Sequence, residues 1–182
     1  MNQRTGERSK PMISIHALDN AEQIVQALPQ GILLNTNGDK FNSMVIAWGS
    51  LGTIWGLPAF TVYVRQSRYT KLQLDKTGEF SISAPDIGNS LDKNICRVFG
   101  SLSGRDVSKA DYVTLTPGRS IHVPAIREYP LTLECRVLYQ QDQELEKLPR
   151  EIRDRFYGHD ADLGDFHTAY IGQIVDAYRI DG

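Results

Sequence analysis

The sequence has few cysteines and no long apolar run. Its 182 residues include two cysteines, Cys96 and Cys135, which form neither a CxxC pair nor a zinc-binding spacing. The first ten residues are polar and lack the apolar segment of a secretory signal. No apolar run reaches the length that a membrane span requires. We therefore expect a cytoplasmic protein that has two reduced thiols and does not contact a membrane.

Several sequence motifs of common enzyme classes are also absent. No GxGxxG segment follows a strand pattern, which argues against a Rossmann site for a dinucleotide. Neither GxxxxGK[ST] nor GxSxG occurs, so nothing indicates a nucleoside triphosphatase or the nucleophile turn of a hydrolase. The 20 basic and 22 acidic residues give a net charge of −2. This balance gives no reason to expect binding to nucleic acid, because such proteins usually carry a basic face.

Acidic residues and histidines gather in one segment near the C-terminus. Its spacing does not fit an EF-hand, because a glycine stands at the fifth position, and it contains no i, i+4 histidine pair. We interpret the segment as a solvated acidic loop and expect no metal site. The residues concerned are His159, Asp160, Asp162, Asp165 and His167.

The length and the hydrophobic pattern predict one domain made mainly of short strands. Residues 1–12 read as a flexible arm, and residues 13–182 as the domain. Many strands with few helices favour a barrel or a sandwich over a doubly wound sheet. The predicted strands are 31–36, 42–48, 59–65, 79–84, 131–139 and 168–180, and the predicted helical segments are 21–28, 67–76, 87–98 and 148–156.

Caps and turns support these boundaries. Asp19 and Glu22 resemble a capping box for the first helix. Residues 37–40 read Asn-Gly-Asp-Lys, which is typical of a hairpin turn. Ser67 is the expected N-cap of the second helix, and Gly78 is its expected end.

The segment 65–70 joins a strand end to a helix start. Backbone amides at a helix N-terminus favour an anion. The guanidinium groups of Arg65 and Arg68, with nearby hydroxyls, could bind phosphate oxygens there. The alternative is a helix capped by Ser67 with two solvated surface arginines.

Two more segments could contact a ligand. Alternation along 42–48 places Asn42, Met44 and Trp48 on one face, which could bracket a planar heteroaromatic ring. The alternative is a core strand with a buried tryptophan.

In the segment 101–106, small residues near Arg105 and Lys109 could hold an anionic group. A helix-linking loop with Arg105 paired to Asp106 explains that segment equally well.

Taken together and in order, these segments resemble the flavin reductase-like, FMN-binding split-barrel family, especially its flavoredoxin-like branch. The resemblance covers roughly residues 31–180. It implies a mainly β, Greek-key split β-barrel with a few peripheral helices that forms a homodimer. The stretches that carry it are 42–52, Trp55-Gly56, Pro58, 60–70, Cys96, 103–107, 134–136, 165–167 and 170–172.

The resemblance also implies a function and a set of site residues. It implies an oxidoreductase that passes hydride or electrons from NADH or NADPH through FMN to a second acceptor. That acceptor would be a free flavin, a partner monooxygenase, another redox protein or a small oxidised substrate. The alternative is an electron-transfer flavoprotein that is reduced by a protein donor and has no useful NAD(P)H activity.

His167 would orient the nicotinamide or donate a proton. The residues assigned to the cofactor are Asn42, Ser43, Met44, Trp48, Arg65, Ser67, Arg68, Tyr69, Thr70, Cys96, Ser103, Gly104, Lys109 and Tyr170.

The sequence departs from the family pattern at three places. Val45 replaces a frequent threonine, Ser108 and Ala110 flank Lys109 where Asp and Phe are usual, and Thr168-Ala169 replaces a larger pair. The first change removes a hydroxyl that could reach the flavin, and the other two affect the expected contacts of Lys109 and of the nicotinamide.

Overall fold

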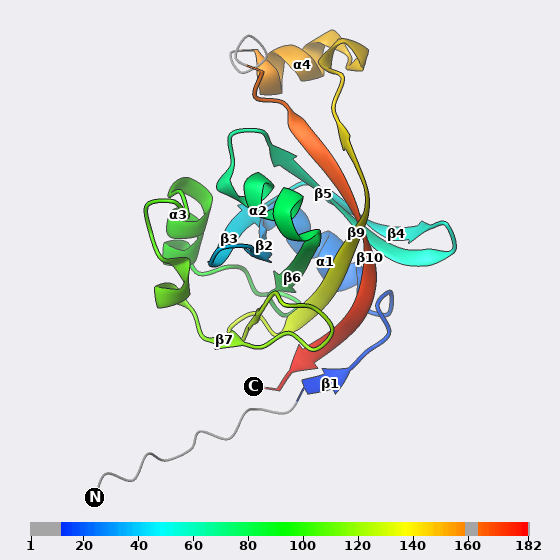
Figure 1. The fold of residues 1–182 in the computed structure, drawn as a ribbon. Helices are drawn as coiled ribbons and strands as arrows, with labels where there is room; N and C mark the ends of the chain where they lie inside the picture. The colour runs from blue at the N-terminus through cyan, green and yellow to red at the C-terminus, as the bar shows by residue number, and fades with distance from the viewer. Residues whose placement is uncertain (1–11, 159–163, 182) are drawn as a thin grey trace, which may run out of the picture.

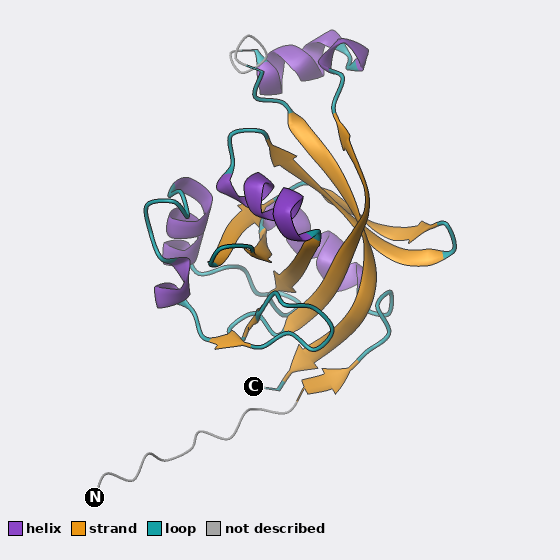
Figure 2. Cartoon of the chain, in the orientation of Figure 1, coloured by secondary structure: helices purple, strands orange, loops and turns teal. Residues whose placement is uncertain are grey.

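The computed structural model describes residues 12–158 and 164–181 of the chain. Most described strands belong to one curved sheet, and the helices lie at its periphery (Figures 1 and 2). The strands are β1 (Met12–Ser14), β2 (Ile32–Asn37), β3 (Phe41–Ile46), β4 (Gly49–Ile54), β5 (Leu57–Arg65), β6 (Glu79–Ala84), β7 (Leu115–Thr116), β8 (Ala125–Ile126), β9 (Leu131–Asp142) and β10 (His167–Ile180). The helices are α1 (Ala21–Ala27), α2 (Tyr69–Thr77), α3 (Lys93–Ser101) and α4 (Arg150–Tyr157), with short 3₁₀ turns η1 (Leu28–Gln30), η2 (Lys109–Tyr112) and η3 (Leu145–Lys147).

The main sheet forms an open barrel. Its strand order is β3-β2-β6-β9-β10-β5-β4, with β1 added beside β10, and β7 pairs with β8 separately. Each pairing in the described residues is antiparallel. β3 and β4 follow each other in the chain but lie at opposite ends of this hydrogen-bonded order, so Ala47 and Trp48 cross an open seam. The expectation of a mainly β split barrel is confirmed.

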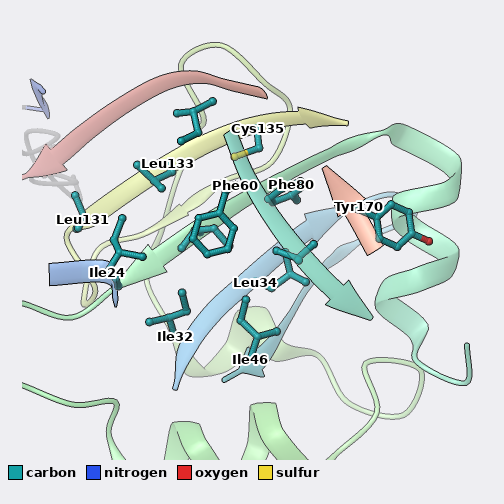
Figure 3. Close-up of a cluster of buried hydrophobic side chains, with 14 of the residues drawn as sticks. Ile24, Ile32, Leu34, Ile46, Phe60, Phe80, Leu131, Leu133, Cys135 and Tyr170 are labelled. Carbon is teal, nitrogen blue, oxygen red and sulfur yellow. The ribbon is translucent and has the colours of Figure 1, made fainter. Parts of the chain in front are cut away.

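The barrel interior is filled by large apolar side chains from most of these strands. Figure 3 shows Phe60 and Phe80 at the centre of this cluster, with Leu34 and Leu133 beside them. A Cβ added at Gly172 on β10 would lie 2.5 Å from Cε1 of Phe80. The absence of a side chain at this position therefore makes room for the Phe80 ring.

Cys135 is fully buried in the same cluster. Burial raises the pKa of its thiol well above the ordinary value. The thiol therefore stays protonated and packs as a small apolar side chain.

The helices occur near their predicted positions: α1 starts at the predicted residue, whereas α2, α3 and α4 start two to six residues later than predicted. Asn20 precedes α1 without a side-chain cap, so the capping box predicted from Asp19 is wrong. α2 begins two residues after Ser67, with Arg68 at its N-cap position. α3 begins after Asp92, whose Oδ1 accepts hydrogen bonds from the amides of residues 94 and 95. The predicted end of α2 at Gly78 is confirmed, with φ at +63°.

The sequence pattern does not predict β4. Its residues, Gly-Ser-Leu-Gly-Thr-Ile, include two glycines, which are poor strand formers, so they read as a loop. Pairing with β5 across all six residues makes them a strand. The resulting β4–β5 hairpin projects from the barrel in Figure 1.

No helix within 12–158 or 164–181 combines the length and the apolar character that crossing a membrane would take. The predicted N-terminal arm falls almost entirely on residues 1–11, which lie outside the described residues.

Candidate functional site

Two adjacent cavities lie beside β3. The first, called here the polar cavity, has a volume of about 140 Å³. The second, called the aromatic cavity, has a volume of about 300 Å³ and reaches the open seam of the barrel. Met44, Val45 and Arg68 line both cavities, so the two are neighbouring parts of one groove.

The polar cavity lies between β3, the start of α2 and the end of α3. Three cationic side chains line it, those of Arg68, Arg105 and Lys109. No described aspartate or glutamate lines it. This local excess of positive charge, in a chain of net charge −2, is suited to an anion. Its remaining walls are Asn42, Ser67, Tyr69, Thr70, Phe99, Gly100, Leu102, Ser103 and Gly104.

Asn42 connects β3 to the first turn of α2. Its Nδ2 donates a hydrogen bond of 2.8 Å to Oγ1 of Thr70. Its Oδ1 is buried and accepts no hydrogen bond from any described residue. A Cβ added at Gly104 would overlap this oxygen, so the loop backbone approaches Asn42 closely. A buried unsatisfied acceptor is costly, and in a cavity wall it is a candidate contact for a hydroxyl or amide of a ligand.

Lys109 is buried beneath the polar cavity. Its Nζ donates hydrogen bonds to the carbonyl oxygens of Ser43, at 2.6 Å, and Phe99, at 3.3 Å. Burial, and to a smaller extent the charge of Arg68, lowers the pKa of this ammonium from 10.5 to about 8. Lys109 is therefore mostly a cation at neutral pH. Anion binding in the cavity would stabilise that charge.

The start of α2 has no side-chain cap among the described residues. The amides of its first turn are therefore suited to bind an anion. The Tyr69 ring lies beside this turn, with the Arg105 guanidinium carbon 5.4 Å from the ring centroid. Arg105 also donates a hydrogen bond of 3.3 Å to the carbonyl of Ser67. No salt bridge between Arg105 and Asp106 is formed, so the loop interpretation based on that pair is not supported.

Aromatic rings surround the second cavity. The Trp48 ring packs edge-on against Phe156, with centroids 5.2 Å apart, and lies 5.1 Å from His167. Tyr63 and Arg65 from β5 complete this wall. Trp48 is 41% exposed, so the alternative of a tryptophan buried in the core is wrong. Flat apolar walls of this kind are suited to a planar ring system.

Arg65 does not line the polar cavity, and Ser67, which does line it, does not cap α2 as the sequence suggests. Arg65 lines the aromatic cavity and donates hydrogen bonds to the carbonyls of Phe156, at 2.7 Å, and Asp165, at 3.0 Å. The Asp165 carboxylate accepts hydrogen bonds from the amide and the hydroxyl of Ser67, at 2.8 and 2.9 Å. Ser67 is thus bonded to Asp165 and does not cap α2. Arg68 is the arginine of this turn that lines the polar cavity.

Three other predicted residues lie outside the cavity walls. Tyr170 is fully buried in the core, and its hydroxyl donates a hydrogen bond of 2.6 Å to Asp75 on α2. Cys96 is half-buried on α3. Ser43 is buried, and its backbone carbonyl is the acceptor for Lys109. The metal interpretation rests partly on His159, Asp160 and Asp162, which lie outside the described residues.

Tyr63 and Phe156 line the groove but were not among the predicted site residues. Arg105 also lines it, and the sequence indicated it as a possible contact for an anion without assigning it to the cofactor. The sequence could have identified Tyr63 as a site residue, because alternation along β5 places its side chain on the same face as that of Arg65. Phe156 comes from the long connection between β9 and β10, whose position depends on tertiary contacts.

A third cavity, called the apolar cavity, lies on the other side of Trp48. Its volume is about 550 Å³, and its walls come from α1, η1, residues 47–49, β5, the segment between β9 and α4, and α4 itself. Val25, Trp48 and Ile152 in these walls are 56%, 41% and 45% exposed.

Comparison with protein families matches residues 25–182 to the flavin reductase like domain. An uncharacterized protein of Archaeoglobus fulgidus is 30% identical over 116 residues. That match covers 63% of this chain and 52% of the relative, so the chain spans about half the length of this curated protein.

Solved structures show the same fold at low identity. A flavoredoxin from Methanosarcina acetivorans has a TM-score of 0.60 and 21% identity, over 98% of this chain and 75% of that one. An FMN-binding protein from Thermus thermophilus has a TM-score of 0.62 and 21% identity, over 84% and 72%. The NADH:FAD oxidoreductase of Streptomyces globisporus has a TM-score of 0.62 and 17% identity, over 82% and 74%.

Proposed function

This chain belongs to the family of flavin reductase-like domains, and we propose that it is an FMN-binding oxidoreductase that uses NADH or NADPH as its reductant. The observation that carries the proposal is the polar cavity, where three cations and the uncapped start of α2 meet without a carboxylate in the described walls. A single phosphate group at the end of a flexible chain fits this charge and this volume.

The proposed phosphate contacts come from three elements. Arg68 at the start of α2, Arg105 from the loop after α3 and Lys109 from η2 would each add a charged hydrogen bond. Such bonds contribute on the order of 1.5–3 kcal/mol each. Oδ1 of Asn42 would accept a hydrogen bond from a hydroxyl of the ribityl chain, which removes the cost of its buried, unpaired state.

The aromatic cavity would hold the isoalloxazine ring. Met44 and Val45 continue its wall from the polar cavity, and Trp48 lies at its far end. His167 is the side chain proposed to orient the nicotinamide or to donate a proton. When bound, FMN supplies the hydride and electron chemistry, while the chain supplies binding, orientation and exclusion of water.

We also propose that two copies associate through the apolar cavity. Exposed side chains of the size of Val25, Trp48 and Ile152, gathered around a hollow, are typical of an interaction surface. Light scattering should report a dimer of the 20.5 kDa chain. Ile152→Glu should weaken that dimer, whereas Leu138→Glu, at a residue that is 44% exposed outside the cavity, should not. A monomer at all concentrations would contradict this proposal.

The function is tested by calorimetry and by a visible absorption spectrum of the purified protein. We expect one FMN to bind per chain, and we expect NADH or NADPH to bleach the flavin absorption of the complex. Absence of binding at micromolar FMN would refute the proposal. Binding without reduction by either nicotinamide would instead support an electron-transfer flavoprotein that accepts electrons from a protein donor.

A further inference from the structure

The hydroxyl of Tyr157 lies between two polar groups next to the aromatic cavity. Its oxygen is 2.7 Å from Oε1 of Gln143, to which it donates, and 2.8 Å from Nδ1 of His167. Tyr157 is the last residue of α4 and is only 3% exposed. Resting on the proposed function, we propose that Tyr157 is a positioning residue that fixes the ring orientation and the tautomer of His167.

The orientation of the His167 ring is held by packing as well as by this hydrogen bond. The rings of Tyr157 and His167 are nearly perpendicular, with centroids 5.5 Å apart, and Trp48 contacts His167 from another direction. The Arg65 guanidinium lies 5.3 Å from the Tyr157 ring centroid and donates a hydrogen bond to the carbonyl of Phe156. These contacts fasten the end of α4 beside the cavity, so the Tyr157 hydroxyl has little freedom to move.

The tautomer follows from counting protons. A tyrosine hydroxyl carries one proton, and here that proton points to the Gln143 oxygen. With that proton directed at the Gln143 oxygen, the short distance to His167 fits an Nδ1 that carries a proton and donates to Tyr157. Burial raises the pKa of Tyr157, so its hydroxyl keeps its proton and can fill this role. Neutral His167 is therefore protonated at Nδ1, and Nε2 is its basic nitrogen.

This assignment specifies what His167 can do in the cavity that it lines. An unprotonated Nε2 accepts a hydrogen bond or takes up a proton, and the protonated ring can return that proton to a bound ligand. Tyr157 and Gln143 together favour the proton on Nδ1 over the proton on Nε2. Thus the α4 segment, which sequence reasoning did not connect with the site, sets the chemistry of a residue on β10.

The test is the ¹⁵N spectrum of the imidazole rings in apoprotein labelled at histidine, at a pH where His167 is neutral. The His167 signals are assigned by their loss in His167→Gln. We expect the wild type to show protonation at Nδ1 and Tyr157→Phe to show a mixture of both tautomers. Tyr139→Phe is the matched control, because that exposed hydroxyl bonds only to Gln141 among the described residues. It should leave the His167 signals unchanged.

Gln143→Leu provides a second test that keeps Tyr157 in place, and it remains available if Tyr157→Phe does not fold. Without the glutamine oxygen, the tyrosine proton should turn to Nδ1 and shift His167 to the Nε2-protonated form. Protonation of Nε2 in the wild type would overturn the inference. So would a tautomer unaffected by both variants. These spectra are recorded without flavin, so they test the tautomer of His167 alone. A failure of the proposed function would be seen in a different measurement, as the absence of FMN binding by the wild type.

Discussion

The backbone of Gly104 approaches Oδ1 of Asn42 so closely that a methyl group added at Gly104 would overlap this oxygen. The added carbon would also lie 3.1 Å from Cδ1 of Tyr69. Gly104 and Asn42 are 62 positions apart in the sequence, and they meet in the wall of the polar cavity. The shape of the proposed phosphate site therefore depends on a position that has no side chain.

Gly104→Ala should weaken FMN binding by about tenfold, because overpacking of this kind costs about 1–3 kcal/mol and displaces the loop from the cavity. Calorimetry measures the change. Gly52→Ala is the matched control, since a Cβ on that strand residue would have no neighbour within 4 Å. Equal FMN affinities in the two variants would show that the loop does not contact the ligand.

The affinity for FMN should fall as the pH rises above about 8. Lys109 has its pKa lowered to about 8, so above this pH the protein without ligand loses a proton that anion binding must restore. The decrease should approach about tenfold per pH unit, the limit for one proton. Riboflavin carries no phosphate, so its affinity should stay level over the same range.

Lys109→Met should remove this pH dependence, whereas Lys71→Met should retain it. Lys71 pairs with Asp75 on α2, at 2.8 Å, and does not line the polar cavity. A pH dependence that persists in Lys109→Met would assign the proton to another group.

Glu134→Gln should lower the free energy of unfolding by about 2–3 kcal/mol without changing FMN affinity. The buried Glu134 carboxylate accepts hydrogen bonds from the amides of residues 119–121, at 2.6–3.2 Å, and from the Tyr178 hydroxyl, at 2.8 Å. The glutamine amide nitrogen cannot accept, so buried donors lose their partners. Glu128→Gln, at an exposed acceptor for the Thr114 amide, should cost less than about 1 kcal/mol. Equal stability losses in urea denaturation would refute this role for Glu134.

Local patterns predicted the elements of the fold well because most of them are determined by neighbouring residues. The β2–β3 hairpin follows from the turn at 37–40, and α2 ends at Gly78, whose positive φ suits glycine. The start of α2 was wrong because Asp165, 98 positions later, takes the amide and hydroxyl of Ser67. No local pattern reports such a distant partner.

The site residues were predicted unevenly for the same reason. Arg68 and Gly104 lie in segments whose residue types indicate anion binding, and Asn42 lies in the segment predicted to bracket a planar ring. The structure brings all three to one cavity. Tyr170 was assigned to the cofactor, yet its ring fills the core and its hydroxyl bonds to Asp75. Which face of a strand lines a cavity depends on the curvature of the whole barrel, which alternation alone does not give.

The central claim is that the polar cavity binds the phosphate of FMN, and Arg68→Ala tests it most directly. Loss of a charged hydrogen bond worth about 1.5–3 kcal/mol should weaken FMN binding by roughly tenfold to a hundredfold. Riboflavin has the same ring and ribityl chain without the phosphate, so its affinity should hardly change. Arg97→Ala, which removes an exposed arginine of α3 that bonds to Asn94, should leave both affinities unaltered. If Arg68→Ala weakens FMN and riboflavin equally, or weakens neither, the phosphate does not bind at Arg68 and the account is contradicted.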